Sequence, residues 1–476
     1  MPSEKLIVIV GATGNQGGSV ATVFLEEPGW KVRALTRDPS STKSQALAAR
    51  GAEVVQANMD IPESLSAAFV GANAIFAVSD FWGQYFDPSN KDKARPGQSL
   101  NAWVGEHETQ QLKNMIDAAA KVPTLERFIL SSLSNATKWS KGKYTHVYHF
   151  DSKAKAEEYG KETYPDLWAK TSIYQAGLFL SNYFAGGLSA PIKNSEGVVQ
   201  FIGHLEKDVK FPFVAAEEDS GPLVKALVLE SPGKNLIGYR EWLTVQELAS
   251  SFTKATGMNA EVVTLPKGSF PPSVPTELKE TIEDNMAYWN EFGYEGRDDP
   301  TVIHPRDLMS PPSLDTVEAY FKKSQDLSSA ANEVPIAYPS KLWALLNGIE
   351  QAPRKKCIIF SAWKSPLDLT AKLLNGASLR HDRIHGGLSL NQRLKVPNSF
   401  KSSLGPNILL MTLGTGAEEL NLTVATRIYL PEPQWNPSKV LLSYKRWQER
   451  SVLDRPSTGV VCVRYVTEIP LSRATY

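Results

Sequence analysis

The stretch "IVIVGATGNQGGSV", residues 7–20, constrains the fold more than any other part of the chain. An apolar run leads into three glycines at positions 11, 14 and 17, and an amphipathic segment follows. Glycines at this spacing permit a tight turn, close approach of the backbone to a ligand, and close packing of a helix on a strand. The helix begins with free N–H groups at the positive end of its dipole. The pattern predicts a strand, a loop and a helix that together bind a pyrophosphate; the alternative is a glycine-rich turn without a ligand.

Short apolar runs and amphipathic segments alternate over residues 1–175, and the runs are "KLIVIV", "KVRALT", "AEVVQA", "NAIFAV", "RFILSS" and "AKTSIY". These runs are apolar throughout, as in parallel strands buried on both faces. In the first helix, Val20, Val23 and Phe24 have the spacing of a stripe that faces the core. Residues 1–175 therefore predict an α/β domain with a doubly wound parallel sheet, the NAD(P)-binding Rossmann fold.

The remaining residues divide into three parts. Residues 176–322 contain "GKNLIGYREWLTVQELASSFTKATG", a strand, a helix and a glycine stop, and predict a smaller α/β lobe at the carboxyl edge of the sheet. Residues 323–339 lose apolar periodicity and gain Ser, Ala and Pro, as in a linker. Residues 340–476 resume the alternation of strands and helices and predict a further α/β lobe.

The composition excludes several classes of protein. Lys plus Arg equals Asp plus Glu at 51 each, so no net charge attracts nucleic acid or an acidic membrane. The two cysteines, Cys357 and Cys462, cannot form a disulfide framework or a cysteine-rich zinc site, and we predict no metal. The N-terminal apolar run is too short for a signal peptide, and no run reaches the ~18 residues of a membrane span. We expect an intracellular protein, located in the cytoplasm or alternatively in the nucleus.

Arg37 follows the second predicted strand, 20 residues after Gly17. In dinucleotide-binding folds a residue at this position distinguishes a 2′-phosphate from free ribose hydroxyls. A guanidinium can pair with the phosphate through two hydrogen bonds, and the hydroxyls of Ser40 and Ser41 would add to this contact. We therefore predict NADP(H) in preference to NAD(H). The alternative is that Asp38 turns inward and binds the ribose.

Further cofactor contacts are expected at the ends of the first, third and fourth predicted strands. Asp60 either belongs to this group or caps the helix that begins near Pro62, and Trp82 is alternatively a core residue. Ser79 would line the same channel. The predicted contacts, in addition to Arg37, Ser40 and Ser41, are Gly11, Ala12, Thr13, Gly14, Asn15, Gln16, Gly17, Asn58, Met59, Asp80, Phe81 and Trp82.

The segment "HVYHFDSKAKAEEY", residues 146–159, places Lys153 four residues after His149. In a large class of nicotinamide-dependent reductases a tyrosine precedes the lysine at this spacing. The lysine lowers the tyrosine pKa from ~10 and anchors the nicotinamide ribose. A histidine next to a lysine is mostly neutral at pH 7, and Tyr148 is one residue out of register. We expect Lys153 to keep the ribose contact and His149 to be neutral and hydrogen-bonded; the alternative is that His149 donates a proton.

Ser131 and Ser132 end the strand before this segment. A serine at that place would orient a substrate carbonyl. The alternative is that both hydroxyls satisfy backbone groups.

Taken together, "GATGNQGGSV", "VRALTRDPSS", "DFW" and "HFDSKA" followed by "EEY" resemble the NmrA-like family, atypical members of the short-chain dehydrogenase superfamily, over residues 4–322. The resemblance implies NADP(H) binding and a redox-responsive role in transcription regulation through protein partners, without dehydrogenase activity. It assigns residues 11–16 to the pyrophosphate, Arg37 to the 2′-phosphate and Lys153 to the nicotinamide ribose, and leaves no catalytic residue. Asn58 departs from the family, because many relatives carry Asp there.

Residues 340–468 resemble the second RecA-type lobe of Swi/Snf-type helicases, through "CIIFSAW", "HDRIHGGLSLNQR" and "MTLGTGAEELNLTVATRIYLPEPQWNPS". The residues that reach ATP in that family are degraded: Leu442 replaces a glutamine and Glu449 an arginine, while Arg446 matches the other arginine. The sequence contains no Gly-x-x-x-x-Gly-Lys-Ser/Thr loop, so we expect no ATPase or helicase activity. This tail is a relic, a partner-binding lobe or the product of two joined reading frames.

Three functions follow from these patterns. The first is an NADP(H)-binding regulatory protein that senses the dinucleotide and acts on a protein partner such as a transcription factor. The second is an NADPH-dependent oxidoreductase whose acid is His149 or an ordered water. The third is a chromatin-associated protein that acts through the helicase-like tail.

Overall fold

The computed structural model divides the chain into two compact units, Met1–Lys323 and Ser324–Tyr476. It describes residues 4–329 except 184–188, 195, 271–273 and 275. In the second unit it describes residues 345, 349, 355–361, 367, 370, 371, 374, 375, 379–384, 390–402, 405–412, 424, 425, 427–430 and 461–464. Each unit is described by itself.

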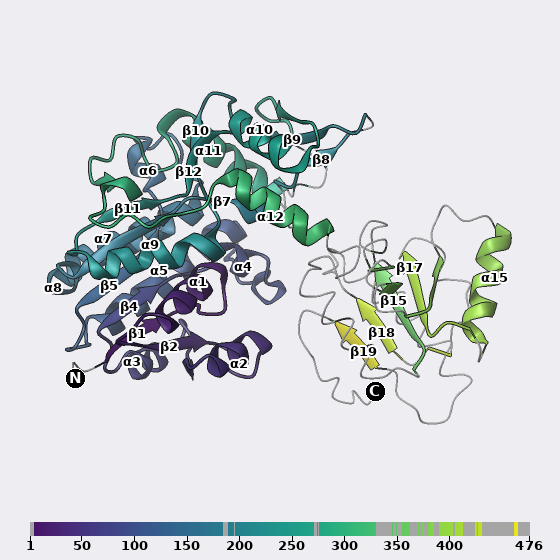
Figure 1. The fold of residues 1–476 in the computed structure, drawn as a ribbon, viewed down its shortest axis with the longest axis horizontal. Coiled ribbons are helices and arrows are strands. Elements are labelled where there is room, and N and C mark those ends of the chain that lie inside the picture. The colour runs from purple at the N-terminus through teal and green to yellow at the C-terminus, as the bar shows by residue number, and fades with distance from the viewer. Residues whose placement is uncertain are drawn as a thin grey trace. The chain divides into compact units, whose positions relative to one another are not determined.

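The first unit is built on an eight-stranded sheet in the order β14-β11-β6-β5-β4-β1-β2-β3, and every pairing in it is parallel (Figure 1). The order reverses between β1 and β4, which makes a switch point of the doubly wound type, where ligands bind. The predicted Rossmann fold is confirmed. The strands are β1 (Lys5–Ile9), β2 (Trp30–Thr36), β3 (Glu53–Gln56), β4 (Ala74–Ala77), β5 (Arg127–Ser132), β6 (Thr171–Ala176), β11 (Asn235–Gly238) and β14 (Val302–Ile303).

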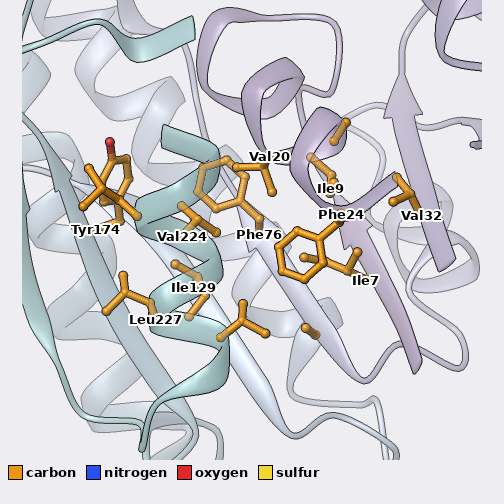
Figure 2. Close-up of a cluster of buried hydrophobic side chains, with 14 of the residues drawn as sticks. Ile7, Ile9, Val20, Phe24, Val32, Phe76, Ile129, Tyr174, Val224 and Leu227 are labelled. Atoms are coloured by element: carbon orange, nitrogen blue, oxygen red, sulfur yellow. The ribbon is translucent and has the colours of Figure 1, made fainter. Parts of the chain in front are cut away.

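Helices cover both faces of this sheet because side chains of its strands alternate between two apolar layers. In β1, Ile7 and Ile9 enter the layer under α1 (Asn15–Leu25) and α9 (Ala216–Leu229), and Val8 enters the opposite layer. The opposite layer lies under α3 (Pro62–Ala68), α5 (Leu100–Ala119) and α7 (Tyr148–Thr163). Figure 2 shows the first layer, with contributions from both helices at Val20, Phe24, Val224 and Leu227.

Residues 176–322 form a smaller lobe and also extend the main sheet. The predicted strand before the glycine-stopped helix is two strands, because β11 joins the main sheet and β12 (Glu241–Thr244) pairs with β10 (Lys210–Val214). The helix is α10 (Val245–Thr256), which ends at Gly257 with φ of 70°. The other strands of the lobe are β7 (Leu178–Phe179), β8 (Ile192–Lys193), β9 (Val199–Gly203) and β13 (Ala260–Thr264).

Helices α5 and α7 begin earlier than the sequence predicts. The helix expected from His107 begins at Leu100, where the Ser99 hydroxyl accepts a hydrogen bond from the Ala102 N–H at 3.2 Å. The helix expected from Ser152 begins at Tyr148, so His149 lies in its first turn. The remaining α-helices are α2 (Thr42–Ala49), α4 (Phe81–Tyr85), α6 (Ala136–Trp139), α8 (Pro165–Trp168), α11 (Thr276–Phe292) and α12 (Val317–Ser329), and short 3-10 turns cover Pro88–Asn90, Leu180–Tyr183 and Pro305–Asp307.

The second unit contains a parallel sheet in the order β16-β17-β15-β18-β19. Its elements are β15 (Cys357–Ser361), β16 (His381–Ile384), α15 (Leu390–Lys401), β17 (Ile408–Thr412), β18 (Arg427–Leu430) and β19 (Val461–Arg464). The α/β lobe predicted for the tail is thus present. Helix α12 runs into the segment expected to be a linker, and residues 330–339, 442, 446 and 449 lie outside the described residues. In the part of the chain that the structure describes, no helix is long and apolar enough to cross a membrane.

Helices α1 and α9 approach closely because Gly221 has no side chain. A Cβ at this position would lie 2.4 Å from the backbone oxygen of Ser19. The Ser19 hydroxyl donates to the Glu218 oxygen at 3.1 Å and accepts from the Gly221 N–H at 2.9 Å. This contact sets the position of the helix that carries the glycine loop.

We predict that Gly221→Ala destabilises the first unit by about 1–3 kcal/mol, since the new methyl group forces the two helices apart. Helix propensity alone would give the opposite sign. The matched control is Gly203→Ala, because no atom lies within 4 Å of a Cβ placed there; its effect should stay within about 0.5 kcal/mol. Urea unfolding, with hydrogen exchange of α1 and α9 amides, measures both variants. Equal stability of the two variants would contradict the close contact.

Candidate functional site

The glycine loop between β1 and α1 has the geometry of an anion site. Gly11 has φ of 65°, and its oxygen accepts a hydrogen bond from the Gly14 N–H at 2.9 Å. A Cβ at Gly17 would lie 2.2 Å from that same oxygen. Gly14 precedes α1, and no side chain caps the first turn. The loop therefore leaves the N–H groups at the start of α1 available to a phosphate.

The other loop residues differ in their surroundings. Ala12 is buried, Thr13 is half-buried and Asn15 is exposed. The Gln16 side-chain oxygen accepts a hydrogen bond from the Ser131 hydroxyl at 2.9 Å, which ties the loop to the end of β5. The Ser132 hydroxyl donates to the Glu157 carboxylate. The Ser132 hydroxyl also lies 3.5 Å from the Leu133 backbone oxygen, so the alternative that a hydroxyl satisfies a backbone group holds for Ser132 and not for Ser131. A role in orienting a carbonyl stays a prediction.

The side chains of Arg37 and Asp38 differ in whether they have hydrogen-bond partners. Arg37 is exposed, and its guanidinium forms no hydrogen bond or ion pair with any described residue. The Asp38 carboxylate accepts from the Ser40 N–H at 2.8 Å and from the Ser40 hydroxyl at 2.5 Å. These hydrogen bonds hold the pKa of Asp38 below its ordinary value. Because Asp38 is occupied within its own turn and Arg37 is free, the geometry favours Arg37 as the reader of the phosphate.

The two serines near Arg37 have structural partners. Ser40 donates to Asp38, and Ser41 caps α2 by accepting from the Ser44 N–H at 3.3 Å. Lys43, which the sequence analysis did not select, donates from Nζ to the Thr13 oxygen at 3.3 Å. A second exposed cation therefore lies against the glycine loop.

The loop after β3 is fastened to α5. The Asn58 side-chain oxygen accepts from the Asp60 N–H at 3.0 Å, and the oxygen of half-buried Met59 accepts from Asn114 at 2.8 Å. Asp60 Oδ1 accepts a hydrogen bond from Gln111 Nε2 at 2.8 Å, and it also lies 2.8 Å from His107 Nε2. Helix α3 has no side-chain cap. The capping role considered for Asp60 is therefore wrong, because α5 supplies its partners.

The residues after β4 lie next to α7. Asp80 caps α4 by accepting from the Gly83 N–H at 2.9 Å. Phe81 is buried and Trp82 is half-buried. Their ring centroids lie 5.7 and 5.1 Å from that of His149. The fold thus brings the "DFW" segment against His149.

A buried carboxylate, Glu108 of α5, joins three elements at the site. It accepts from the Lys153 ammonium at 2.8 Å, from the Ser79 hydroxyl at 2.7 Å and from the Ser152 hydroxyl. Lys153 also donates to the His149 backbone oxygen at 3.0 Å. Glu108 is fully buried and Lys153 is 7% exposed. The ion pair holds the ammonium in one place, because a buried charge is stable only beside its partner.

The sequence analysis missed Glu108, although a signal for it exists. Glu108 lies four residues after Val104 and four before Leu112, and both of these are fully buried. This spacing puts all three side chains on one face of α5. An acidic residue in an apolar stripe predicts a buried cationic partner, which the structure identifies as Lys153.

His149 is neutral in the folded protein. Burial, reinforced by Lys153, lowers its pKa to about 3. The expectation that its ring is hydrogen-bonded is wrong for the described residues. Nδ1 is buried without a hydrogen-bond partner among them, and the rings of Phe81, Trp82 and Phe150 pack around the imidazole. Apolar neighbours offer it nothing to bond.

Tyr148 packs against the apolar cluster of Tyr85, Val104 and Leu278, to which Phe81 and Trp82 also belong. Burial raises the pKa of its hydroxyl.

We predict that Glu108→Leu and Lys153→Met each destabilise the fold by about 3–5 kcal/mol, because each leaves a buried charge unpaired. The double variant should recover most of this loss, since it removes both charges. Lys5→Met is the control: it breaks a pair with Glu126 whose side chains are 47% and 46% exposed, and should cost less than about 1 kcal/mol. Additive losses in urea unfolding would show that the pair is not coupled.

We predict that His149 makes the fold less stable as the pH falls below about 6.5. Between that pH and about 3 the unfolded chain binds a proton at this residue that the folded chain does not. The free energy of unfolding therefore drops by up to ~1.4 kcal/mol per pH unit. In His149→Phe the decline between pH 6.5 and 5 should be shallower, as measured by urea unfolding at each pH. An unchanged slope would mean that His149 titrates normally in the folded protein.

Comparisons with known proteins agree with this geometry. Residues 3–321 match the model of the NmrA-like family, and residues 340–447 match that of the helicase conserved C-terminal domain. The NmrA-like family domain-containing oxidoreductase hkm9 of Aspergillus hancockii is 32% identical over 276 residues, which cover 55% of this chain and 75% of the relative. The corresponding oxidoreductase ptmS of Penicillium ochrochloron is 25% identical over 358 residues, or 67% and 98%.

A solved structure of NmrA, a negative transcriptional regulator, in complex with NADP has the same fold, with 19% identity and a TM-score of 0.54 over 70% of this chain and 99% of that one. A complex of NmrA with NAD gives 20% identity and the same TM-score and coverage. The family match extends over most of the chain, and through it this chain belongs to the NmrA-like family.

Proposed function

We propose that this chain is an NADP(H)-binding regulatory protein, which senses the redox state of the dinucleotide and acts on a protein partner such as a transcription regulator. One observation supports the proposal: α7 holds a buried lysine, Lys153, paired with Glu108, and four residues earlier a buried, neutral histidine, His149. The family resemblance expects the ribose anchor at the first position and the acid of a reductase at the second. The relative NmrA, a negative transcriptional regulator with structures in complex with NADP and NAD, supports it.

The residues at the switch point fit this dinucleotide. The uncapped start of α1 suits the pyrophosphate, and the free guanidinium of Arg37, with Lys43 beside the loop, suits a 2′-phosphate. An ammonium has three N–H donors, and Lys153 uses two of them, for Glu108 and the His149 oxygen. The third can reach a ribose hydroxyl. When bound, NADPH would supply a hydride.

A second candidate is an NADPH-dependent oxidoreductase. The curated relatives hkm9 and ptmS are named as oxidoreductases, and they favour this reading. Because the His149 pKa is too low for the ring to carry a transferable proton at pH 7, an ordered water would be the acid. The two candidates share the cofactor and differ in turnover.

We predict that NADP⁺ binds the full chain more tightly than NAD⁺ in calorimetric titration. Arg37→Ala should weaken NADP⁺ about 10- to 100-fold and leave NAD⁺ unchanged, because the guanidinium contacts only the 2′-phosphate. Lys43→Ala should have a smaller effect of the same kind. Lys31→Ala is the charge control, since Lys31 lies at the opposite end of β2 and pairs with Glu4. Equal affinities of the wild type for both dinucleotides would refute the assignment of Arg37.

The same protein distinguishes the two candidates. A sensor must respond differently to NADP⁺ and NADPH, because a ligand shifts an equilibrium only through differential affinity. Hydrogen exchange in α4 and α7 should therefore differ between the two complexes, and NADPH should not be consumed with a panel of carbonyl compounds. Consumption of NADPH would instead establish the oxidoreductase, and identical exchange without turnover would exclude the sensor.

A further inference from the structure

The buried ion pair of Glu108 and Lys153 lies at the end of β4, close to the glycine loop. A Cβ placed at Gly11 would lie 3.0 Å from Val78 Cγ1, so the loop packs directly on the residue after β4. The next residue, Ser79, donates its hydroxyl to Glu108 Oε1 at 2.7 Å. The same oxygen accepts from the Lys153 ammonium at 2.8 Å. Short contacts thus connect the loop that suits a pyrophosphate to the ion pair.

The two charges of this pair are fixed in position and largely out of contact with water. The Glu108 side chain is fully buried, and that of Lys153 is 9% exposed. The hydroxyls of Ser79 and Ser152 donate to the two carboxylate oxygens, and the His149 backbone oxygen accepts from the ammonium. Charges held in this way act more strongly on a neighbouring charge than charges in water do, because little solvent screens them.

Two other titratable side chains near this pair add little charge. His149 is neutral in the folded protein. Asp80, which follows Ser79, is exposed, so water screens its carboxylate. Removal of either Glu108 or Lys153 would therefore leave one poorly screened unit charge at the end of β4, negative for the carboxylate and positive for the ammonium.

The oxidised and reduced dinucleotides differ by one charge, which lies on the nicotinamide ring. NADP⁺ carries a positive charge there and NADPH does not, whereas the phosphates of the two forms are the same. Protein cations at the phosphates therefore attract both forms alike, but a charge next to the nicotinamide ribose distinguishes them. The function proposed above places Lys153 at that ribose. An ammonium without a counter-charge would repel NADP⁺ there and not NADPH.

We propose that Glu108 sets the preference of this site between the two redox forms of the dinucleotide. Its carboxylate offsets the Lys153 charge, and the site therefore admits the cationic NADP⁺ as well as NADPH. Glu108 acts through Lys153 and is a positioning residue, because it holds the ammonium and supplies its counter-charge. This inference rests on the proposed function, since it requires NADP(H) in the site with its nicotinamide ribose at Lys153.

The test measures, by calorimetric titration of the full chain, the dissociation constant of NADP⁺ divided by that of NADPH. Glu108→Gln should raise this ratio about tenfold, because it leaves the ammonium without a counter-charge. Lys153→Met should lower the ratio about tenfold, because the remaining carboxylate attracts the cationic ring. The lost ribose contact weakens both forms alike and cancels in the ratio. Shifts of opposite sign are not expected if the pair only stabilises the fold.

Two further variants separate charge from geometry. Glu108→Asp shortens the side chain but keeps its charge, so the ratio should stay close to that of the wild type. Ser79→Ala is the matched control, because it removes a hydrogen bond to the same carboxylate without changing any charge. An unchanged ratio in Glu108→Gln, or equal shifts in Glu108→Gln and Glu108→Asp, overturns the proposal.

Urea unfolding verifies that each variant is folded under the conditions of the titration. Gln at position 108 can still accept from the ammonium and can donate from its amide group to a serine hydroxyl. Glu108→Gln and Lys153→Met each test the sign of the shift, so one folded variant of the two is sufficient.

The outcomes keep the two proposals apart. If the wild type binds neither dinucleotide, the proposed function is refuted and this inference with it. If the dinucleotides bind and the ratio is the same in all variants, only the role of Glu108 is refuted.

Discussion

The site depends on the buried carboxylate of Glu108. It accepts hydrogen bonds from the loop after β4, through Ser79, and from α7, through Ser152 and Lys153. Removing a charge from water is costly, so the pair is stable only while α5 and α7 keep this arrangement. Lys153 then holds the His149 oxygen as well. One ion pair thereby fixes the ammonium expected at the ribose and the first turn of the helix that carries the histidine.

The same arrangement explains why Lys153 can hold its position although no tyrosine precedes it by four residues. Lysine placement comes from Glu108 and requires no tyrosine. The His149 side chain takes no part in placing the lysine. It is packed among aromatic rings, and burial lowers its pKa to about 3. The result is a site with a buried ammonium at Lys153, a helix α1 whose first turn has no side-chain cap, and a neutral histidine among aromatic rings.

Local patterns predicted six of the eight strands of the main sheet, because the determinants of those six are local, whereas β11 and β14 come from the segment that we assigned to the smaller lobe. Continuous apolar runs specify buried parallel strands, and glycine spacing specifies the loop at the switch point. The start of α7 and the partner of Asp60 were not predictable in this way. Each depends on α5, which lies far away in sequence but adjacent in space: Gln111 and His107 take the carboxylate that local rules assign to a helix cap.

The sequence by itself determined the Rossmann fold, the glycine loop and the presence of a histidine four residues before Lys153, since each depends on residue types and their spacing over a short stretch of chain. Only the tertiary structure decided which charged groups are free. Arg37 has no partner among the described residues, whereas Asp38, Ser40 and Ser41 are engaged within their own loop. The ion pair between Glu108 and Lys153 is likewise visible only in the folded chain. Pairing and burial depend on what folding brings together, and a linear pattern does not specify it.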